Sequence, residues 1–136
     1  GAYEPATGRS QLLRTSRNTR MVDGYKAIPS SLEVALDNFA GIAADCKIAL
    51  LGDMRELGED SAAEHLKLRR RVESMIASGQ LTSACFVGSE FARSGDSFES
   101  SEALADYLRR KQIAGATILI KGSRGVRMEN VIDALR

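Results

Sequence analysis

The chain has few of the residues from which metal centres and catalytic relays are built. Its 136 residues include one histidine, two cysteines, two prolines and no tryptophan. A single histidine excludes a multi-histidine metal site, and no nucleophile with a neighbouring base stands out. Cys46 and Cys85 each lie singly beside an apolar run, without metal-ligand spacing. We therefore expect them to be ordinary buried thiols of a reducing compartment.

Long apolar stretches and an excess of one charge are also missing. No run approaches the roughly 20 apolar residues of a membrane span, and no signal peptide is visible, so we expect a cytoplasmic protein without membrane insertion. The 19 Lys and Arg residues nearly balance the 18 Asp and Glu residues, which argues against a nucleic-acid partner. The basic run at 69–71 is typical of a solvated helix surface.

The size and composition favour one compact domain over residues 1–136. Hydrophobic residues make up 43% of the chain, enough for a core of its own. The chain starts with Gly1 and a loop-like opening segment, 1–10, as a domain from a longer protein would. We therefore expect a fragment of a larger multidomain enzyme.

Apolar runs alternate with helical patterns along the chain. Strands are predicted around 47–51, 84–87 and 117–120, with a hairpin pairing 12–13 and 21–22 and a short edge strand near 97–98. Alternating strands and helices predict a three-layer α/β sandwich with a mostly parallel sheet.

Four helices fill the gaps between these strands. The first is predicted to be capped by Ser30 or Ser31, the second by Ser61 with a stop at Gly79, and the third to start at Ser101. Each helix has apolar residues at helical spacing that are predicted to face inward. They are Leu32, Ala35, Leu36, Phe39 and Ala43 in the first helix and Leu68, Val72, Met75 and Ile76 in the second. In the third they are Leu104, Tyr107 and Leu108, and in the last Met128, Val131, Ile132 and Leu135.

Ligands of such sheets gather at the carboxyl ends of the strands, which singles out the loops 23–30, 52–60, 88–95 and 121–127. In the last loop, Lys121 and Arg124 flank a glycine and a serine, a pattern suited to phosphate or carboxylate. The order of residues is not that of a Walker A loop, and a generic strand-to-helix turn with solvated charges is the alternative.

Other polar residues of these loops have a functional and a structural interpretation. Asp53 stands at a strand tip, where we favour function, whereas Glu59 and Asp60 favour the positive end of the next helix. Tyr25 could stack on a base or be a structural tyrosine. His65 is placed on the polar side of its helix, as a hydrogen-bonding residue rather than a catalyst.

The loops, taken in order, resemble the C-terminal domain of the Mur ligases, the ATP-dependent amide ligases of peptidoglycan synthesis. The motifs that carry the resemblance are GRSQ at 8–11, DGYKAIP at 23–29, LGDMRELG at 51–58 with His65, and IKGSR at 120–124 followed by Met128 and Glu129. It spans essentially the whole chain and is closest to the branch that adds D-Ala-D-Ala to UDP-MurNAc-tripeptide. It implies a Rossmann-like domain that closes over ATP and the incoming dipeptide.

The resemblance also distributes the site residues. It implies nucleotide-side contacts from Arg9, Asp23, Tyr25 and Lys26, and substrate-side contacts from Asp53, Lys121, Gly122, Ser123 and Arg124. No catalytic residue and no metal ligand is assigned to this domain. ATP and Mg²⁺ would be held mainly by the N-terminal and central domains of the same ligase, so the chain alone is expected to be inactive.

One motif departs from the family pattern. The family has asparagines where this chain has Lys26 and Ile28. Lys26 could contact phosphate, but Ile28 cannot replace an amide hydrogen bond. Two alternatives follow: a non-catalytic α/β binding module derived from a Mur ligase, and a Mur-like ligase with another amine substrate.

Overall fold

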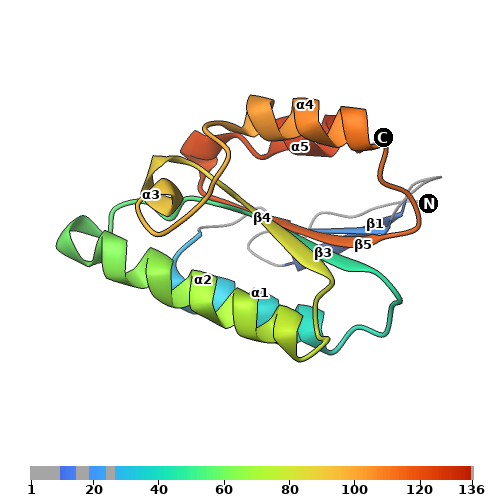
Figure 1. Ribbon diagram of the computed structural model, residues 1–136, viewed down its shortest axis with the longest axis horizontal. Helices are drawn as coiled ribbons and strands as arrows, with labels where there is room; N and C mark the ends of the chain where they lie inside the picture. The colour runs from blue at the N-terminus through green and yellow to red at the C-terminus, as the bar shows by residue number, and fades with distance from the viewer. Residues whose placement is uncertain (1–9, 15–18, 24–26, 136) are drawn as a thin grey trace.

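The computed structural model describes residues 10–14, 19–23 and 27–135, and it is built around one five-stranded sheet (Figure 1). The strands are β1 (Ser10–Arg14), β2 (Thr19–Asp23), β3 (Lys47–Gly52), β4 (Ser83–Val87) and β5 (Thr117–Lys121). Their order is β1-β2-β5-β3-β4. β1 pairs antiparallel with β2, as the hairpin prediction has it, and all other pairs are parallel.

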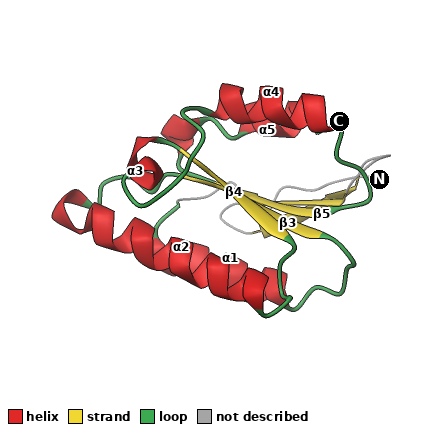
Figure 2. Cartoon of the chain, viewed as in Figure 1, coloured by secondary structure: helices red, strands yellow, loops and turns green. Residues whose placement is uncertain are grey.

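Helices cover both faces of this sheet (Figure 2). α1 (Pro29–Ala40) and α2 (Ser61–Ala77) lie on one face, and α4 (Ser101–Lys111) and α5 (Glu129–Ala134) on the other. A single turn, α3 (Ser89–Ala92), and two 3-10 turns, η1 (Gly58–Asp60) and η2 (Arg124–Val126), lie between them. The expected three-layer α/β sandwich is confirmed.

The strand β3 shows why the sequence of a strand in this sheet is a continuous apolar run. All six of its residues are buried, and its side chains alternate between two cores. Ala49 and Leu51 face α1 and α2, while Ile48 and Leu50 face α4 and α5. A strand covered on both faces has no solvent side on which polar residues would be favoured.

The helix boundaries correct several of the sequence predictions. α1 has Ile28 at its N-cap, and Ser31, one turn inside, hydrogen-bonds back to the Ile28 backbone. Ala43 lies beyond the end of α1 and is exposed. Ser61 is the first residue of α2 and not its cap, and Ile76 is 37% exposed. At the start of α1 the reason is local. Pro29 fixes the φ angle of the first helical position, so this helix begins earlier than the serines suggest.

Three further expectations are refined. Phe98 forms a single parallel bridge to Val87 instead of an edge strand. Both cysteines are free but only half-buried, and burial raises the pKa of the Cys85 thiol. Within the described ranges, no helix has the length and apolar character needed to cross a membrane.

The basic run at 69–71 is only partly a solvated surface. Arg69 lies across the Phe86 ring, 4.2 Å from its centroid, and donates to the carbonyls of Phe91 and Asp96. Arg71 pairs with two carboxylates of α1, and Arg70 is exposed. The prediction therefore fails for Arg69, whose burial lowers its pKa.

The strand β5 and its two neighbours in the sheet, β2 and β3, are followed by helices on opposite faces of the sheet. The loops after β2 and β3 lead to helices on the α1–α2 face, whereas the loop after β5 leads to α5 on the opposite face (Figure 1). Loops that diverge in this way leave a crevice at the carboxyl ends of the strands. The crevice is where the candidate site is found.

Candidate functional site

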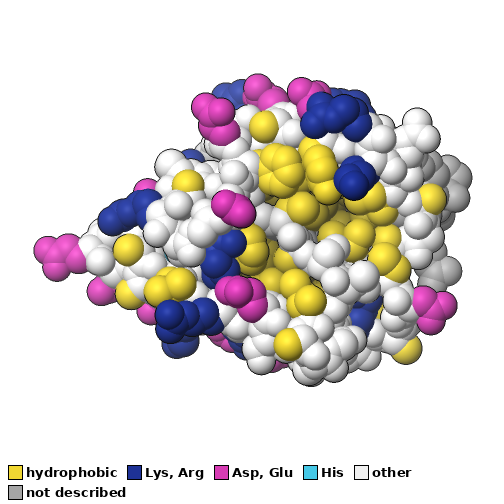
Figure 3. Space-filling model, in the orientation of Figure 1, with side chains coloured by type: hydrophobic (Ala, Val, Ile, Leu, Met, Phe, Trp, Pro, Cys, Tyr) yellow, Lys and Arg dark blue, Asp and Glu magenta, His cyan; other side chains and the backbone are white. Residues whose placement is uncertain are grey.

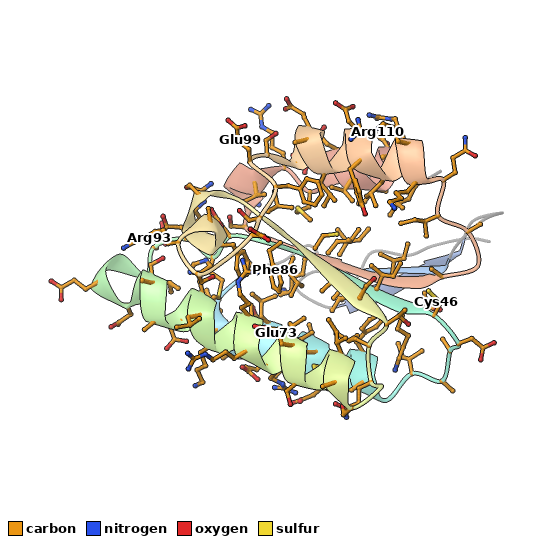
Figure 4. All side chains as sticks on the ribbon, viewed as in Figure 1. Cys46, Glu73, Phe86, Arg93, Glu99 and Arg110 are labelled. Carbon is orange, nitrogen blue, oxygen red and sulfur yellow. The ribbon has the colours of Figure 1, made fainter. Side chains whose placement is uncertain are left out.

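A hollow of about 430 Å³ opens at the carboxyl ends of β3 and β4, between these strand ends, the first turn of α4 and η2. We call it the notch. Figure 4 shows Glu99, one of its residues, beside the first turn of α4. The residues that line the notch are Arg55, Val87, Gly88, Ser89, Glu99, Ser100, Ser101, Glu102, Gly125, Val126 and Arg127.

The loop that follows β5 packs closely on the loop that follows β3. Gly122 has no room for a side chain, since a Cβ there would lie 2.8 Å from Met128 Cγ and 3.0 Å from Gly52 Cα. Ser123 is buried and its amide donates to the Asp53 carbonyl over 3.1 Å. The loops that follow β3 and β5, far apart in sequence, are thereby joined at the switch between these two strands.

Arg55 joins these two loops through its side chain. Its Nε donates to Ser123 Oγ at 3.4 Å, and its guanidinium lies along Gly125. Arg127, from the end of η2, lines the same notch. Arg124, in η2, is exposed on the adjacent turn and is not among the lining residues. Two arginines, Arg55 and Arg127, therefore line the notch, and the sequence prediction included neither among its site residues.

The first turn of α4 provides the opposite wall. Ser100 caps this helix by accepting a hydrogen bond from the Ala103 amide at 3.1 Å. A helix N-terminus carries a partial positive charge, and Glu99 and Glu102 add two carboxylates beside it. The notch therefore offers guanidinium groups for a carboxylate or phosphate and carboxylates for an ammonium or amine.

Asp53, predicted as a substrate-side residue, is fully buried. Its carboxylate accepts hydrogen bonds from the amides of Glu90 at 3.0 Å and Phe91 at 2.9 Å. The side chain thus holds α3 beneath the notch and does not line the hollow. Its direct contact with a substrate stays a prediction.

Two other residues lie deeper than their sequence positions suggest. Lys121 ends β5 with 1% of its surface exposed, directly opposite Asp23 in the β2–β5 register. His65 is fully buried against Phe91, so its placement on the polar side of α2 is wrong. His65 continues the buried stripe of α2 at helical spacing with Ser61, Leu68, Val72 and Met75, so its polar side chain and not its spacing led to the wrong placement.

The nucleotide-side prediction falls mostly beyond the described ranges. Arg9, Tyr25 and Lys26 lie outside the described residues, and Asp23 is placed only by its strand position at the carboxyl end of β2. Among the described residues, no group of three or more His, Cys, Asp or Glu side chains could hold a metal ion.

A second hollow, of about 370 Å³, runs along β4 at the edge of the sheet. Figure 3 shows hydrophobic side chains gathered over this edge between α4 and α2. Its lining includes Phe86, Phe98 and Cys85, and it contains none of the predicted site residues. Those of the predicted site residues that the structure describes are also absent from the lining of the notch, but Arg55 belongs to the 51–58 motif and Gly125 directly follows the 120–124 motif, so the notch is the hollow beside the sequence motifs.

Known proteins resemble this chain in sequence. A family model described as Mur ligase, glutamate ligase domain, matches residues 8–124. The UDP-N-acetylmuramoyl-tripeptide–D-alanyl-D-alanine ligase of Treponema pallidum is 32% identical over 145 residues, covering 98% of this chain and 30% of that protein. The Haemophilus influenzae protein of the same name is 33% identical over 141 residues, covering 95% of this chain and 30% of its own length.

Solved structures share the fold. MurF from Acinetobacter baumannii superposes with a TM-score of 0.81 at 24% identity, covering 97% of this chain and 30% of that one. The MurF ligase of Thermotoga maritima in complex with ADP gives 0.76 at 24% identity, covering 97% and 31%. The chain spans about a third of the length of these proteins. From the family match over 8–124, the relatives and the shared fold, we conclude that the chain belongs to the Mur ligase family.

Proposed function

We propose that this chain is the domain of an ATP-dependent ligase that presents D-Ala-D-Ala to UDP-MurNAc-tripeptide. The observation that carries the proposal is the notch, a hollow at the strand ends whose lining includes two arginines and two glutamates. The names of the relatives from Treponema pallidum and Haemophilus influenzae supply the reaction and both substrates. A dipeptide carries one carboxylate and one amine, which matches the two kinds of charge.

Within the notch, Arg55 and Arg127 would hold the carboxylate of the dipeptide, and Arg124 would extend this cationic side toward the phosphate side. Guanidinium groups suit this task because they bind carboxylates through two parallel hydrogen bonds. Glu99 and Glu102 would orient the amine end. Lys121, Gly122 and Ser123 would anchor the loop after β5 on the end of the sheet, since Lys121 and Ser123 are buried and Gly122 packs against Gly52.

ATP supplies, when bound, the phosphoryl group that activates the carboxyl group of the tripeptide. The nucleotide would lie toward Arg9, Asp23, Tyr25 and Lys26, as the family resemblance implies. As the family resemblance implies, the ligands of Mg²⁺ and the tripeptide site would lie in the other domains of the same cytoplasmic ligase. The task of this chain is to orient the dipeptide and to exclude water on closure.

The test is ATP turnover by the full-length ligase with UDP-MurNAc-tripeptide and D-Ala-D-Ala as substrates. Arg127→Ala and Arg124→Ala should each raise the KM for D-Ala-D-Ala by about tenfold or more, because a charge-assisted hydrogen bond contributes about 1.5–3 kcal/mol. The KM for the tripeptide precursor should stay unchanged. Arg110→Ala, on an exposed position of α4, is the matched control.

If Arg124→Ala leaves turnover and both KM values unchanged, the proposed role of the 121–124 loop is wrong. If Arg127→Ala does so, the notch is not the dipeptide site.

Ile28 gives a reason to test a second function. It stands where the family has an asparagine, it is 37% exposed, and the first turn of α1 uses its backbone and not its side chain. A Mur-like ligase with another amine substrate, or a non-catalytic binding module, would result from a lost polar contact there. Turnover with other amines in place of D-Ala-D-Ala separates the first alternative, and absence of turnover with any amine supports the second.

A further inference from the structure

A cluster of four polar residues lies beneath the wall of the notch, joining β3, α2 and α3. It consists of Asp53, Ser61, His65 and Glu90, and we call it the buried polar cluster. His65 and Asp53 are fully buried, and Ser61 is 5% exposed. The mechanism proposed for the notch uses none of the cluster's side chains as a contact to the dipeptide.

The hydrogen bonds of His65 define its protonation state. Its Nε2 accepts a hydrogen bond from the Met54 amide at 3.0 Å, so this nitrogen carries no proton. Its Nδ1 lies 2.7 Å from the Ser61 carbonyl oxygen, to which it donates. The imidazole is therefore neutral, with its proton on Nδ1.

The Asp53 carboxylate lies next to this ring. Its Oδ1 is 4.0 Å from His65 Nε2, while its two oxygens accept from the Glu90 and Phe91 amides. The edge of the Phe91 ring meets the imidazole with a centroid separation of 4.7 Å. Ser61 Oγ donates to the Glu90 carboxylate, which adds a hydrogen bond between α2 and α3.

These contacts fix one wall of the notch. Val87, Gly88 and Ser89, the residues that lead from β4 into α3, line the notch directly. The Met54 amide held by His65 is next in sequence to Arg55, on the other side of the hollow. The His65 imidazole thus contacts the segments next to Arg55 and to Ser89, although His65 itself does not line the notch.

We propose that neutral His65 is a positioning residue for the notch. It holds the Met54 amide and leaves the Asp53 carboxylate to the amides of α3. A proton on Nε2 would point toward the Met54 N–H and would attract Asp53 away from α3. The charged groups that face the ring are Asp53, directly after β3, and Glu90 in α3; Arg93 and Arg55 lower the pKa of Glu90.

The structural part of this inference stands without the ligase reaction, whereas its kinetic part rests on the proposed function. The two parts are therefore tested by separate measurements on the same full-length ligase. Hydrogen exchange followed by mass spectrometry reports the amides of 53–54 and 88–92, and turnover reports the KM for D-Ala-D-Ala.

Three variants are compared. His65→Leu removes the acceptor for the Met54 amide and should speed exchange at 53–54 and 88–92 by about tenfold, the change expected for one buried hydrogen bond. His65→Gln restores an acceptor that does not titrate, and should keep wild-type exchange. Leu68→Ala, from the buried face of the same helix, is the matched control and should speed exchange across α2 without selecting 88–92.

Rescue by His65→Gln is the readout that a loss of packing alone would not give. Both His65→Leu and His65→Gln remove the imidazole, but only His65→Gln keeps an acceptor for the Met54 amide. Equal exchange rates at 53–54 and 88–92 in the two variants would overturn the proposal, as would His65→Leu exchange that is uniform along the chain or unchanged.

In the kinetic part, His65→Leu should raise the KM for D-Ala-D-Ala by about tenfold with a small change in kcat, as expected for weakened ground-state binding. A fall in kcat alone would contradict positioning of the dipeptide. If the wild-type ligase does not use D-Ala-D-Ala, the proposed function fails while the exchange result still decides the role of His65.

Discussion

At the scale of single residues, the junction between β4 and α3 depends on a glycine. Gly88 has a φ angle of +118°, a region that side chains other than glycine rarely adopt. A Cβ at this position would also lie 2.2 Å from the Asp53 carboxylate. Two independent constraints therefore require glycine at position 88: the positive φ angle and the nearby Asp53 carboxylate.

Gly88→Ala is predicted to destabilise the fold by about 2–4 kcal/mol, the sum of backbone strain and a displaced buried carboxylate. Gly79→Ala is the matched control, since Gly79 has a φ angle of +83° but nothing within 4 Å of its Cβ position. The control should cost only about 1 kcal/mol. Urea unfolding measures both, and equal losses would contradict the assigned clash with Asp53.

Glu90 gives the fold a dependence on acid. The hydrogen bond from the Ser61 hydroxyl holds the pKa of this carboxyl below its ordinary value, and Arg93 and Arg55 act in the same direction. A lowered folded-state pKa means stability that is present above the unfolded pKa, about 4.3, and is lost as pH falls through the folded value.

Ser61→Ala is therefore predicted to have a lower free energy of unfolding than wild type at about pH 6. This difference should become smaller as the pH falls to about 3, because wild type loses the hydrogen bond to the ionised Glu90 carboxylate. Unfolding in urea across this range measures the difference. Made in a Glu90→Gln background, Ser61→Ala should give a difference that does not vary with pH. A pH-dependent difference in that background would assign the effect to another group.

At the scale of elements, the end of α1 is stabilised by a residue of the next strand. Lys47 is buried, and its Nζ donates to the carbonyls of Phe39 at 3.3 Å, Ala40 at 3.2 Å and Ile42 at 2.8 Å. The last carbonyls of a helix carry partial negative charge and have no partner within the helix. The ammonium group satisfies both needs and joins α1 to β3.

Lys47→Met is predicted to lower the free energy of unfolding by about 2–3 kcal/mol, because it leaves buried carbonyl oxygens without a donor. Lys111→Met, at the exposed end of α4, is the control and should change stability by less than about 0.5 kcal/mol. Urea unfolding of the two variants should thus separate them clearly. A loss at Lys47 no greater than at Lys111 would show that the carbonyls find another partner.

At the scale of the whole molecule, the sheet separates two apolar cores, one under α1 and α2 and the other under α4 and α5. The notch lies at the carboxyl ends of β3 and β4 and is a hollow open to solvent, not an enclosed cavity. A site with one open side does not exclude water from a reacting group by itself. In the proposed function, the missing side is supplied by the other domains of the ligase.

The 136-residue chain alone is accordingly predicted to show negligible ligation of D-Ala-D-Ala. Coupled measurement of ADP release, with the full-length ligase as positive control, tests this expectation. Sustained turnover by the chain alone would contradict the division of tasks between domains.

The repeating apolar pattern was sufficient to predict the elements of the sheet. Strands such as 47–51 and 117–120 are continuous apolar runs because both faces of the sheet are covered, and the intervening stripes at helical spacing follow from one buried helix face. The hairpin of 12–13 with 21–22 and the three layers were predicted for the same reason. Element ends were less predictable, as Ser61 and Ala43 show, because a polar residue can bond to a distant loop instead of capping its own helix.

Motif and sequence order also determined which loops meet at the strand ends, since parallel strands bring their carboxyl ends to one edge. The partners within that edge were decided only by the tertiary structure. Asp53 bonds to amides 37 and 38 residues away, His65 is covered by α3, and Arg127 lines the same hollow as Arg55. Periodicity records which face of an element is buried. The side chain or amide that a polar group meets depends on long-range packing, which has no period in the sequence.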